Sequence, residues 1–340
     1  MNEQHSPFGA HKRLFAMIAL AVLATAAVVF GIGQATHYAD LVKRLRNAAG
    51  GWLVVCAAGI AISYFGWVIS YRETARVAGG PLLPPWVALR VVGLSFGAFT
   101  IATTVGGLTV DFWALRQAGE SPTHASARVI ALETLRWAIL GAATAAAAIA
   151  VLVGVARHPP WPVCLAWAVG VPPLFAAGLW ISAPGRRERF IEVKGRLRQA
   201  LGIAVQALVY LRQLLAGARD VRARAVSGGT LYWVGDLLCA WAALRSFGTT
   251  LGVAPLLVGY TTGYLAEALP LPAGGSGGVE AAMTGGFVLA GAPLDGALLG
   301  AVAFRVFNFW LPAAPALVSV FTVRGLRERL QQIARERVAA

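Results

Sequence analysis

The segment Leu269-Pro270-Leu271-Pro272-Ala273-Gly274-Gly275-Ser276-Gly277-Gly278-Val279-Glu280 places two prolines, four glycines and a carboxylate between two apolar runs. A continuous helix cannot pass through it, because proline removes a backbone donor and glycine destabilises a helix interior. In hydrocarbon such a break is tolerated only where it is buried in protein or lines a wet cavity. Transporters use broken helices of this kind to build binding sites near the bilayer midplane, where half-helix N-termini offer N–H groups to an anion.

The composition is that of an integral membrane protein. Hydrophobic residues make up 58% of the chain and charged residues 13%, against about 25% charged in an ordinary soluble domain. Because a spanning helix needs about 20 apolar residues, the sequence predicts an all-α polytopic bundle with six spanning helices and two re-entrant hairpins. The predicted spans are residues 14–33, 52–71, 129–155, 161–183, 230–247 and 294–321, and the predicted hairpins are 86–119 and 255–291.

The net charge of +14 is concentrated in residues 186–224 and in the tail, residues 324–340. The positive-inside rule predicts both segments on the cytoplasmic side, where they attract anionic headgroups. Apolar residues recur at steps of three and four in residues 193–208, which predicts an amphipathic helix on the membrane surface. The sequence therefore predicts one membrane domain over residues 1–323, a basic tail, and both termini on the cytoplasmic side of the cytoplasmic membrane.

Cofactor, metal and nucleic-acid chemistry are not expected. The histidines lie in tails or loops without ligand spacing. Cys56, Cys164 and Cys239 are isolated within apolar runs and are interpreted as small core residues. The positive charge has no soluble domain that would carry it to a nucleic acid.

The two predicted hairpins resemble each other in sequence. Each contains a Gly-Gly pair, then a carboxylate and then a closing glycine, and an otherwise apolar helix carries one charge fourteen residues later. These residues are Gly106, Gly107, Asp111, Gly119 and Glu133 in the first half, and Gly274, Gly275, Glu280, Gly291 and Arg305 in the second. A hairpin and helix repeated with opposite topology is a transporter pattern. The sequence predicts repeat halves at about residues 82–155 and 250–322.

Charges buried in a membrane are usually paired or face water. We expect Glu133 and Arg305 to pair across the repeat axis, with Asp236 and Glu267 as other partners for Arg305. Two interpretations stay open, a structural ion pair and a polar lining that accepts a headgroup. Asp111 and Glu280 could equally stabilise the first turn of a helix after a break.

The second half of the chain resembles a flippase-like membrane family related to the transmembrane region of lysylphosphatidylglycerol synthase. The matching residues are Pro270 or Pro272, Gly274, Gly275, Gly277, Gly278, Val279, Glu280, Ala281, Gly291, Arg305 and the run Phe309-Trp310-Leu311-Pro312. The first half matches more loosely at Gly106, Gly107, Gly119 and Glu133, and Thr103-Thr104-Val105 replaces the family's usual Asn and Pro. The resemblance extends over about residues 14–323.

This resemblance implies a membrane transporter that moves a lipid or lipid-linked headgroup. Aminoacyl-transferring members append a soluble catalytic domain, whereas this sequence ends at Ala340 after a basic tail, so we do not expect lysyl transfer. The expected partners are membrane lipids, either anionic or aminoacylated phospholipids or polyprenyl or hopanoid lipids. The predicted translocation site consists of Gly274, Gly275, Gly277, Gly278, Glu280, Arg305, Glu133, Gly106, Gly107 and Asp111.

Two other functions stay open at this point. Opposed half-helix ends would also suit a small-ion channel or carrier. An intramembrane enzyme could use Ser95, which lies in the Gly-x-Ser-x-Gly run of residues 93–97, or Ser276 in the glycine-rich break. A nucleophile elbow needs a strand-turn-helix context and a histidine within reach, and no histidine lies within an apolar run.

Overall fold

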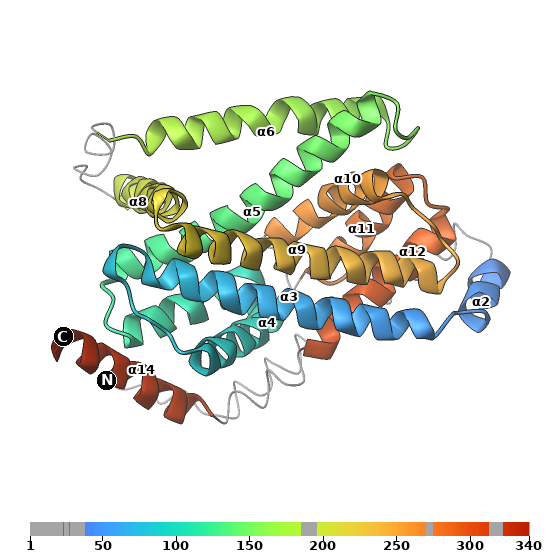
Figure 1. Ribbon diagram of the computed structural model, residues 1–340. Helices are drawn as coiled ribbons and strands as arrows, with labels where there is room; N and C mark the ends of the chain where they lie inside the picture. Colours follow the sequence, from blue (N-terminus) through green and yellow to red (C-terminus); the bar gives the residue numbers. More distant parts are fainter. Residues whose placement is uncertain are drawn as a thin grey trace.

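The computed structural model describes residues 38–184, 196–269, 275–312 and 322–339, together with the isolated Leu23 and Ala27. These residues form helices and turns, with no strand among them. Figure 1 shows α3 and α9 side by side across the middle of the molecule, with α5 running obliquely between them and α6. The elements are α2 (Tyr38–Arg46), α3 (Gly51–Arg76), η1 (Val77–Gly79), α4 (Pro85–Gln117), α5 (Pro122–Leu152), α6 (Trp161–Ile181), α8 (Arg196–Ala216), α9 (Arg219–Ser246), α10 (Val253–Tyr264), η2 (Leu265–Ala268), α11 (Gly278–Leu289), α12 (Leu294–Arg305), the π-helical turn η4 (Val306–Trp310) and α14 (Val323–Ala339).

Four of the described helices are long and apolar enough to cross a membrane. One of them covers the predicted span 52–71, two overlap most of the predicted spans 129–155 and 161–183, and the fourth lies within α8. The four segments are Gly51–Gly79, Pro122–Leu152, Trp161–Ile181 and Gln199–Ala216. The chain is therefore a helical membrane protein, as its composition predicts.

The other predicted spans have different outcomes. The span 230–247 falls in the second part of the longer helix α9, which begins at Arg219 and ends at Ser246. The span 294–321 is helical from Leu294 to Pro312, with the π-helical turn η4 following α12 at Val306, while residues 313–321 lie outside the described part. The span 14–33 falls outside the described residues except for its two isolated positions.

The basic segment of residues 186–224 contains α8, which confirms a helix from Arg196 onward within the predicted residues 193–208. Residues 185–195 lie outside the described part, α8 occupies most of the rest, and Arg219 already begins α9. Val205, Val209 and Leu214 of α8 are buried, and the helix packs on α5. Figure 1 shows α8 end-on, transverse to α3 and α9. A helix lying in the membrane surface would have this direction relative to helices that cross the bilayer.

Helices α3 and α9 pack antiparallel along a seam of four glycines. Gly59 lies against Gly235, and Gly66 lies against Gly228. A Cβ added at any of them would come within 2.4 to 2.7 Å of a backbone atom of the opposite helix. Small residues therefore allow the two backbones to touch, as in other membrane helix pairs.

The contacts along this glycine seam are symmetric. Gly59 and Gly228 stand 169 positions apart in the sequence, and so do Gly66 and Gly235. A Cβ at Gly59 would also meet the Cys239 nitrogen at 2.9 Å, and one at Gly228 would meet the nitrogen of Ser70, which precedes Cys239 by the same 169 positions, at 2.7 Å. If each residue of α3 is replaced by the residue of α9 that stands 169 positions later, and the reverse, the list of contacts between the two helices stays the same.

Helix α4 folds back on itself, although it is helical from Pro85 to Gln117. The Ser95 hydroxyl donates a hydrogen bond to the Asp111 carboxylate, and a Cβ on Gly107 would lie 3.4 Å from the Ser95 carbonyl oxygen. Sixteen residues of straight helix would separate the first pair by about 24 Å. The chain therefore reverses between these positions and forms two antiparallel arms, which we call the first hairpin.

Helices α10 and α11 form the second hairpin. A Cβ on Gly259 would lie 2.4 Å from the Gly286 carbonyl oxygen, and one on Gly263 would lie 2.7 Å from that of Ala282. The arms are thus antiparallel and in backbone contact. Residues 270–274, the first part of the glycine-rich break, lie outside the described part, and the chain resumes at Gly275.

The two hairpins begin at opposite ends of the α3/α9 pair. The first starts beside the C-terminal end of α3, where Arg72 donates a hydrogen bond to the Leu83 carbonyl at 2.8 Å. The second follows the C-terminal end of α9, where Ser246 accepts a backbone hydrogen bond from Ala49 at 2.9 Å, just before α3 begins. Because α3 and α9 are antiparallel, these are opposite ends of the bundle.

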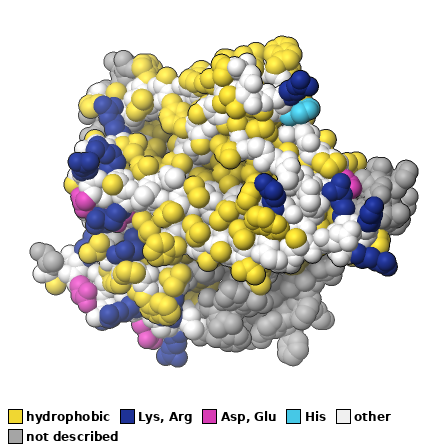
Figure 2. Space-filling view, turned by 45° about the vertical axis from the view of Figure 1, so that its right-hand side comes forward, with side chains coloured by type: hydrophobic (Ala, Val, Ile, Leu, Met, Phe, Trp, Pro, Cys, Tyr) yellow, Lys and Arg dark blue, Asp and Glu magenta, His cyan; other side chains and the backbone are white. Residues whose placement is uncertain are grey.

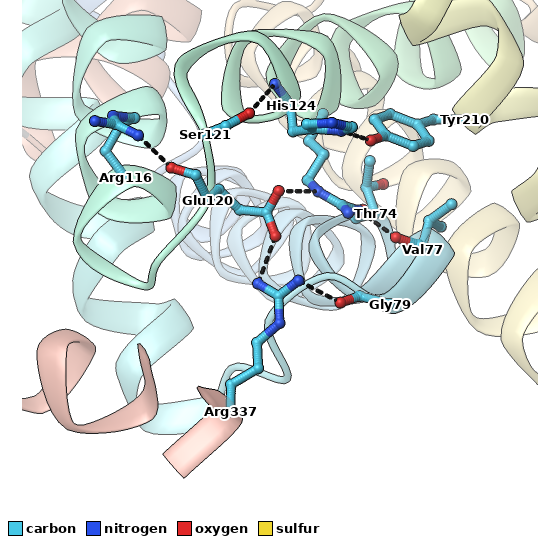
Figure 3. A network of polar contacts seen from close by, with 10 residues as sticks. Thr74, Val77, Gly79, Arg116, Glu120, Ser121, His124, Tyr210 and Arg337 are labelled. Atoms are coloured by element: carbon cyan, nitrogen blue, oxygen red, sulfur yellow. Dashed lines mark hydrogen bonds and ion pairs between the residues drawn. The ribbon is translucent and has the colours of Figure 1, made fainter. Parts of the chain in front are cut away.

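The C-terminal helix α14 is tied to the base of the first hairpin, as Figure 3 shows. Glu120 is 5% exposed and receives a hydrogen bond from Arg128 at 3.2 Å and one from Arg337 of α14 at 2.5 Å. Arg337 also donates to the Gly79 carbonyl. One buried carboxylate therefore links α5, the loop after α4 and the C-terminal helix.

The surface divides into an apolar middle and charged margins. Figure 2 shows hydrophobic side chains over much of the visible face, with Lys and Arg gathered mainly toward its left and right sides. This is the distribution expected for a bundle whose middle faces lipid and whose ends face water.

Candidate functional site

A cavity of about 150 Å³, here called the central cavity, lies where the tips of the two hairpins meet. Leu108 and Asp111 line it from the first hairpin, and Tyr264 and Glu267 line it from the second. Helices α3, α5 and α9 and the turn η4 complete the wall. The remaining lining residues are Trp67, Phe96, Phe99, Gly107, Glu133, Arg136, Trp137, Tyr232, Trp233, Ala268 and Asn308.

Arg136 supplies the central cavity with unused hydrogen-bond donors. Its Nη2 donates to Glu133 at 2.8 Å, whereas Nε and Nη1 are buried without a hydrogen-bond partner among the described residues. The guanidinium carbon lies 4.5 Å from the ring centroid of Trp67 and 4.4 Å from that of Tyr232. A buried donor without a partner costs about 1–3 kcal/mol. Two such donors on a guanidinium held between rings indicate a place for an anionic group.

Aromatic rings form much of the remaining cavity wall. The Trp137 ring lies 5.8 Å from that of Trp233 and 6.0 Å from that of Tyr264. The indole N–H of Trp233 donates to the Arg136 carbonyl at 2.6 Å, which fixes this ring against α5. Rings interleaved with carboxylates attract cations through the ring quadrupole as well as through charge. The cavity can therefore accommodate both an anionic and a cationic group.

Asp111 faces the cavity from the second arm of the first hairpin and is 1% exposed. Its carboxylate accepts the Ser95 hydrogen bond, and it makes no ion pair among the described residues. The Gly-x-Ser-x-Gly serine is thus held by a carboxylate. The two described histidines lie at opposite ends of the bundle. His124 hydrogen-bonds Tyr210 beside the base of the first hairpin, and His158 packs on Gly291 at the base of the second.

A second buried charge cluster lies behind the second hairpin tip. Arg305 donates to Glu267 at 3.0 Å and lies 3.5 Å from the Glu280 carboxylate. The other Glu280 oxygen accepts the backbone N–H of Gly277 at 2.7 Å, so Glu280 caps α11. Gly277 has φ 83°, which glycine adopts without strain. Here the glycine frame and its carboxylate hold the hairpin tip together.

The expected pairing of Glu133 with Arg305 is wrong. Glu133 pairs with Arg136, three residues further along the same helix, and Arg305 pairs with Glu267 and Glu280. Of the two alternative partners of Arg305, Glu267 is confirmed, whereas Asp236 makes no ion pair with it among the described residues. The physical reason is proximity, because each arginine has a carboxylate from its own half of the chain within ion-pair distance.

The structure separates the predicted site residues into two groups. Gly107, Asp111 and Glu133 line the central cavity, and Gly106 precedes Gly107 in α4. Gly275, Gly277, Gly278, Glu280 and Arg305 belong to the second hairpin tip and its buried ion pairs, and Gly274 lies outside the described residues. Sequence reasoning missed Arg136 and the aromatic wall.

A consistent signal for Arg136 exists in the sequence. Asp111 and Glu280 stand 169 positions apart, as do Arg136 and Arg305. This is the shift that relates the glycines of the α3/α9 seam. Gly106 and Gly275 obey it too. Aligning the halves on their closing glycines changes the shift to 172 and matches Arg305 with Glu133 instead.

Asp236 of α9 lies near the central cavity without lining it. It is fully buried, and its carboxylate accepts hydrogen bonds from the Tyr260 hydroxyl and, at 2.6 Å, from the Asn308 amide. Asn308 is placed there by the π-helical turn η4. This carboxylate also makes no ion pair among the described residues.

An apolar groove of about 570 Å³ adjoins the central cavity. It runs between α5, α6 and α8, and Leu135, Val171 and Leu208 are among its lining residues. Leu108, Glu133 and Trp137 line both spaces. The central cavity, which contains charged groups, and the apolar groove therefore meet at one wall formed by α5 and the first hairpin.

The fold and the site define a polytopic helical membrane protein with a charged cavity enclosed between two helical hairpins. The chain belongs to the family described as the lysylphosphatidylglycerol synthase TM region, whose model matches residues 12–316. This confirms the resemblance noted in the sequence and places the protein among membrane proteins with a lipid-related function. Comparison with curated proteins gives no significant match.

Proposed function

We propose that the protein is a flippase-like transporter that moves a lipid or lipid-linked headgroup across the cytoplasmic membrane. The observation that carries the proposal is the junction of the central cavity with the apolar groove through Leu108, Glu133 and Trp137. A lipid has the same division, since its headgroup needs polar partners and its chains need apolar ones. The headgroup occupies the cavity while the chains stay in the groove.

The polar groups of the cavity favour a phosphate-bearing headgroup. The two free donors of Arg136 suit a phosphate oxygen pair. Asp111 and Glu267, set among the aromatic rings, suit an amine on the same headgroup. Anionic and aminoacylated phospholipids, both expected from the sequence, offer these groups.

The proposed topology is an inverted repeat with two re-entrant hairpins entering from opposite faces. The opposite positions of the hairpin bases and the symmetric seam of α3 and α9 support it. Basic residues of α14 and of the start of α9 gather at the first hairpin's base, which the positive-inside rule assigns to the cytoplasm. With a span at residues 14–33, both termini are then cytoplasmic.

The proposal is tested by lipid movement in proteoliposomes. Phospholipids labelled on an acyl chain are reconstituted with the protein, and a membrane-impermeant reductant reports how much label reaches the outer leaflet. Wild type is expected to exchange label between leaflets. Arg136→Gln is expected to lose this exchange, and Arg335→Gln, which changes an exposed arginine of α14, is expected to keep it. If labelled lipid moves between the leaflets no faster in liposomes with the wild-type protein than in protein-free liposomes, the proposal is refuted.

A further inference from the structure

The centre of the bundle contains more carboxylates than guanidinium groups. Among the described residues there, five acidic side chains face the two arginines Arg136 and Arg305. The acidic residues are Asp111, Glu133, Asp236, Glu267 and Glu280. Fully ionised, this cluster would carry a surplus of three negative charges. Uncompensated charges are costly in a low-dielectric interior, so cations must neutralise them.

The ion pairs show which carboxylates already have a positive partner, and the carboxylates outside these pairs are the ones that need a cation. Glu133 is paired with Arg136, and Glu267 and Glu280 share Arg305. Asp111 and Asp236 instead have neutral partners, a serine hydroxyl for the first and a tyrosine hydroxyl and an amide for the second. A carboxyl group held by neutral hydrogen-bonding groups can carry a proton without losing them.

Of these two carboxylates, Asp111 is the one that a headgroup can reach, because it lines the central cavity. The groups facing it come from three elements: Ser95 from the other arm of α4, Tyr71 from α3, and Glu133 and Arg136 from α5. The Tyr71 hydroxyl lies 3.5 Å from the Asp111 carbonyl oxygen. The charge of Glu133 is already balanced by Arg136, whose Nη2 donates to it, so a cation that entered the cavity would meet Asp111 as its counter-charge.

We propose that lipid movement is coupled to proton antiport through Asp111, an inference that rests on the proposed function. Asp111 is protonated while the cavity is empty. An ammonium-bearing headgroup entering from one side displaces the proton, which leaves to that side, and the ammonium becomes the counter-ion of the carboxylate. When the headgroup leaves to the opposite side, Asp111 takes up a proton from there. One proton therefore crosses for each headgroup, in the opposite direction.

The coupling predicts a lipid distribution that follows the pH gradient. Protons run from the acidic to the alkaline compartment, so the ammonium lipid accumulates in the leaflet that faces the acidic one. One pH unit corresponds to a tenfold ratio for a one-proton exchange. The probes are acyl-labelled aminoacylated phosphatidylglycerol and, without an ammonium group, acyl-labelled phosphatidylglycerol. A pH-sensitive dye inside the vesicles records proton movement when the aminoacylated lipid is added outside.

Asp111→Asn and Asp236→Asn form a matched pair, since both neutralise a core carboxylate and the second does not line the cavity. Asp111→Asn is expected to abolish the asymmetry and the dye signal, whereas Asp236→Asn keeps both. Lipid exchange that ignores the pH gradient overturns the coupling alone, and a response to a sodium gradient assigns it to a metal cation. Absence of any exchange by wild type at uniform pH overturns the proposed function instead. If Asp111→Asn does not fold, the wild-type protein still tests the coupling, because a dye signal on addition of the aminoacylated lipid supports proton antiport and its absence overturns it.

Discussion

Neighbouring glycines of α11 should respond oppositely to the same substitution. A Cβ at Gly286 would lie 2.2 Å from the Gly259 carbonyl oxygen and 3.0 Å from the Gly263 nitrogen, whereas a Cβ at Gly285 would have nothing within 4 Å. Alanine at Gly285 gains about 1 kcal/mol of helix propensity. Alanine at Gly286 gains the same propensity but forces the two arms of the second hairpin apart by roughly 1 Å, and overpacking of this kind costs about 1–3 kcal/mol. We expect Gly286→Ala to be less stable than Gly285→Ala by about 1–3 kcal/mol.

The difference is measurable as thermal unfolding of the purified variants in one detergent, followed by tryptophan fluorescence. Gly285→Ala is expected to unfold at or above the wild-type temperature and Gly286→Ala several degrees below Gly285→Ala. Transport should follow the same order, because Glu267 at the hairpin tip lines the central cavity. Equal unfolding temperatures for the two variants would refute the backbone contact between the hairpin arms.

Two further predictions concern the buried ion pairs. Arg305→Gln alone should lower the free energy of unfolding by about 3–5 kcal/mol, because it leaves Glu267 and Glu280 buried without a guanidinium. Adding Glu267→Gln should recover more than 1 kcal/mol of this loss in a double-mutant cycle. Additive losses would contradict the ion pair between Arg305 and Glu267. Arg337→Ala should release α14, seen as faster proteolysis within residues 322–339 than in Arg335→Ala, with the thermal unfolding of the remaining bundle retained; equal cleavage rates would show that the Arg337 contacts do not hold the helix.

The membrane class and the position of the second hairpin could be predicted because they depend on composition and on local backbone chemistry. Proline and glycine between residues 269 and 280 must interrupt a helix wherever the chain goes. The first hairpin is harder to predict, because Gly106 and Gly107 remain within helical hydrogen bonding and the reversal is seen from the contact of Ser95 with Asp111. The predicted hairpin at residues 86–119 places these two residues on facing arms, but the sequence does not show that they touch.

The candidate site was predicted less completely, because its chemistry depends on which charges are already satisfied. Glu133 and Arg305 stand out as charges in apolar helices, but Arg136 lies one helical turn from Glu133 and is easily taken for its simple ion-pair partner. Its importance comes from the two donors that Glu133 leaves unused. The rings of Trp67 and Tyr232, which hold the guanidinium, come from helices distant in the sequence.

The two halves share a framework but use it differently. The shift of 169 positions matches Arg136 with Arg305, but it matches Glu267 with Ala98. The carboxylate of Glu267, which pairs with Arg305, therefore has no counterpart in the first half. Arg305 is consequently bound to two carboxylates behind its hairpin tip, while Arg136 faces the cavity with free donors. Breaking the contacts of Arg305 would leave buried charges uncompensated, whereas the first hairpin meets the cavity through Asp111 and its neutral partner. Of the two hairpins, the first is therefore the one that can change position at lower electrostatic cost.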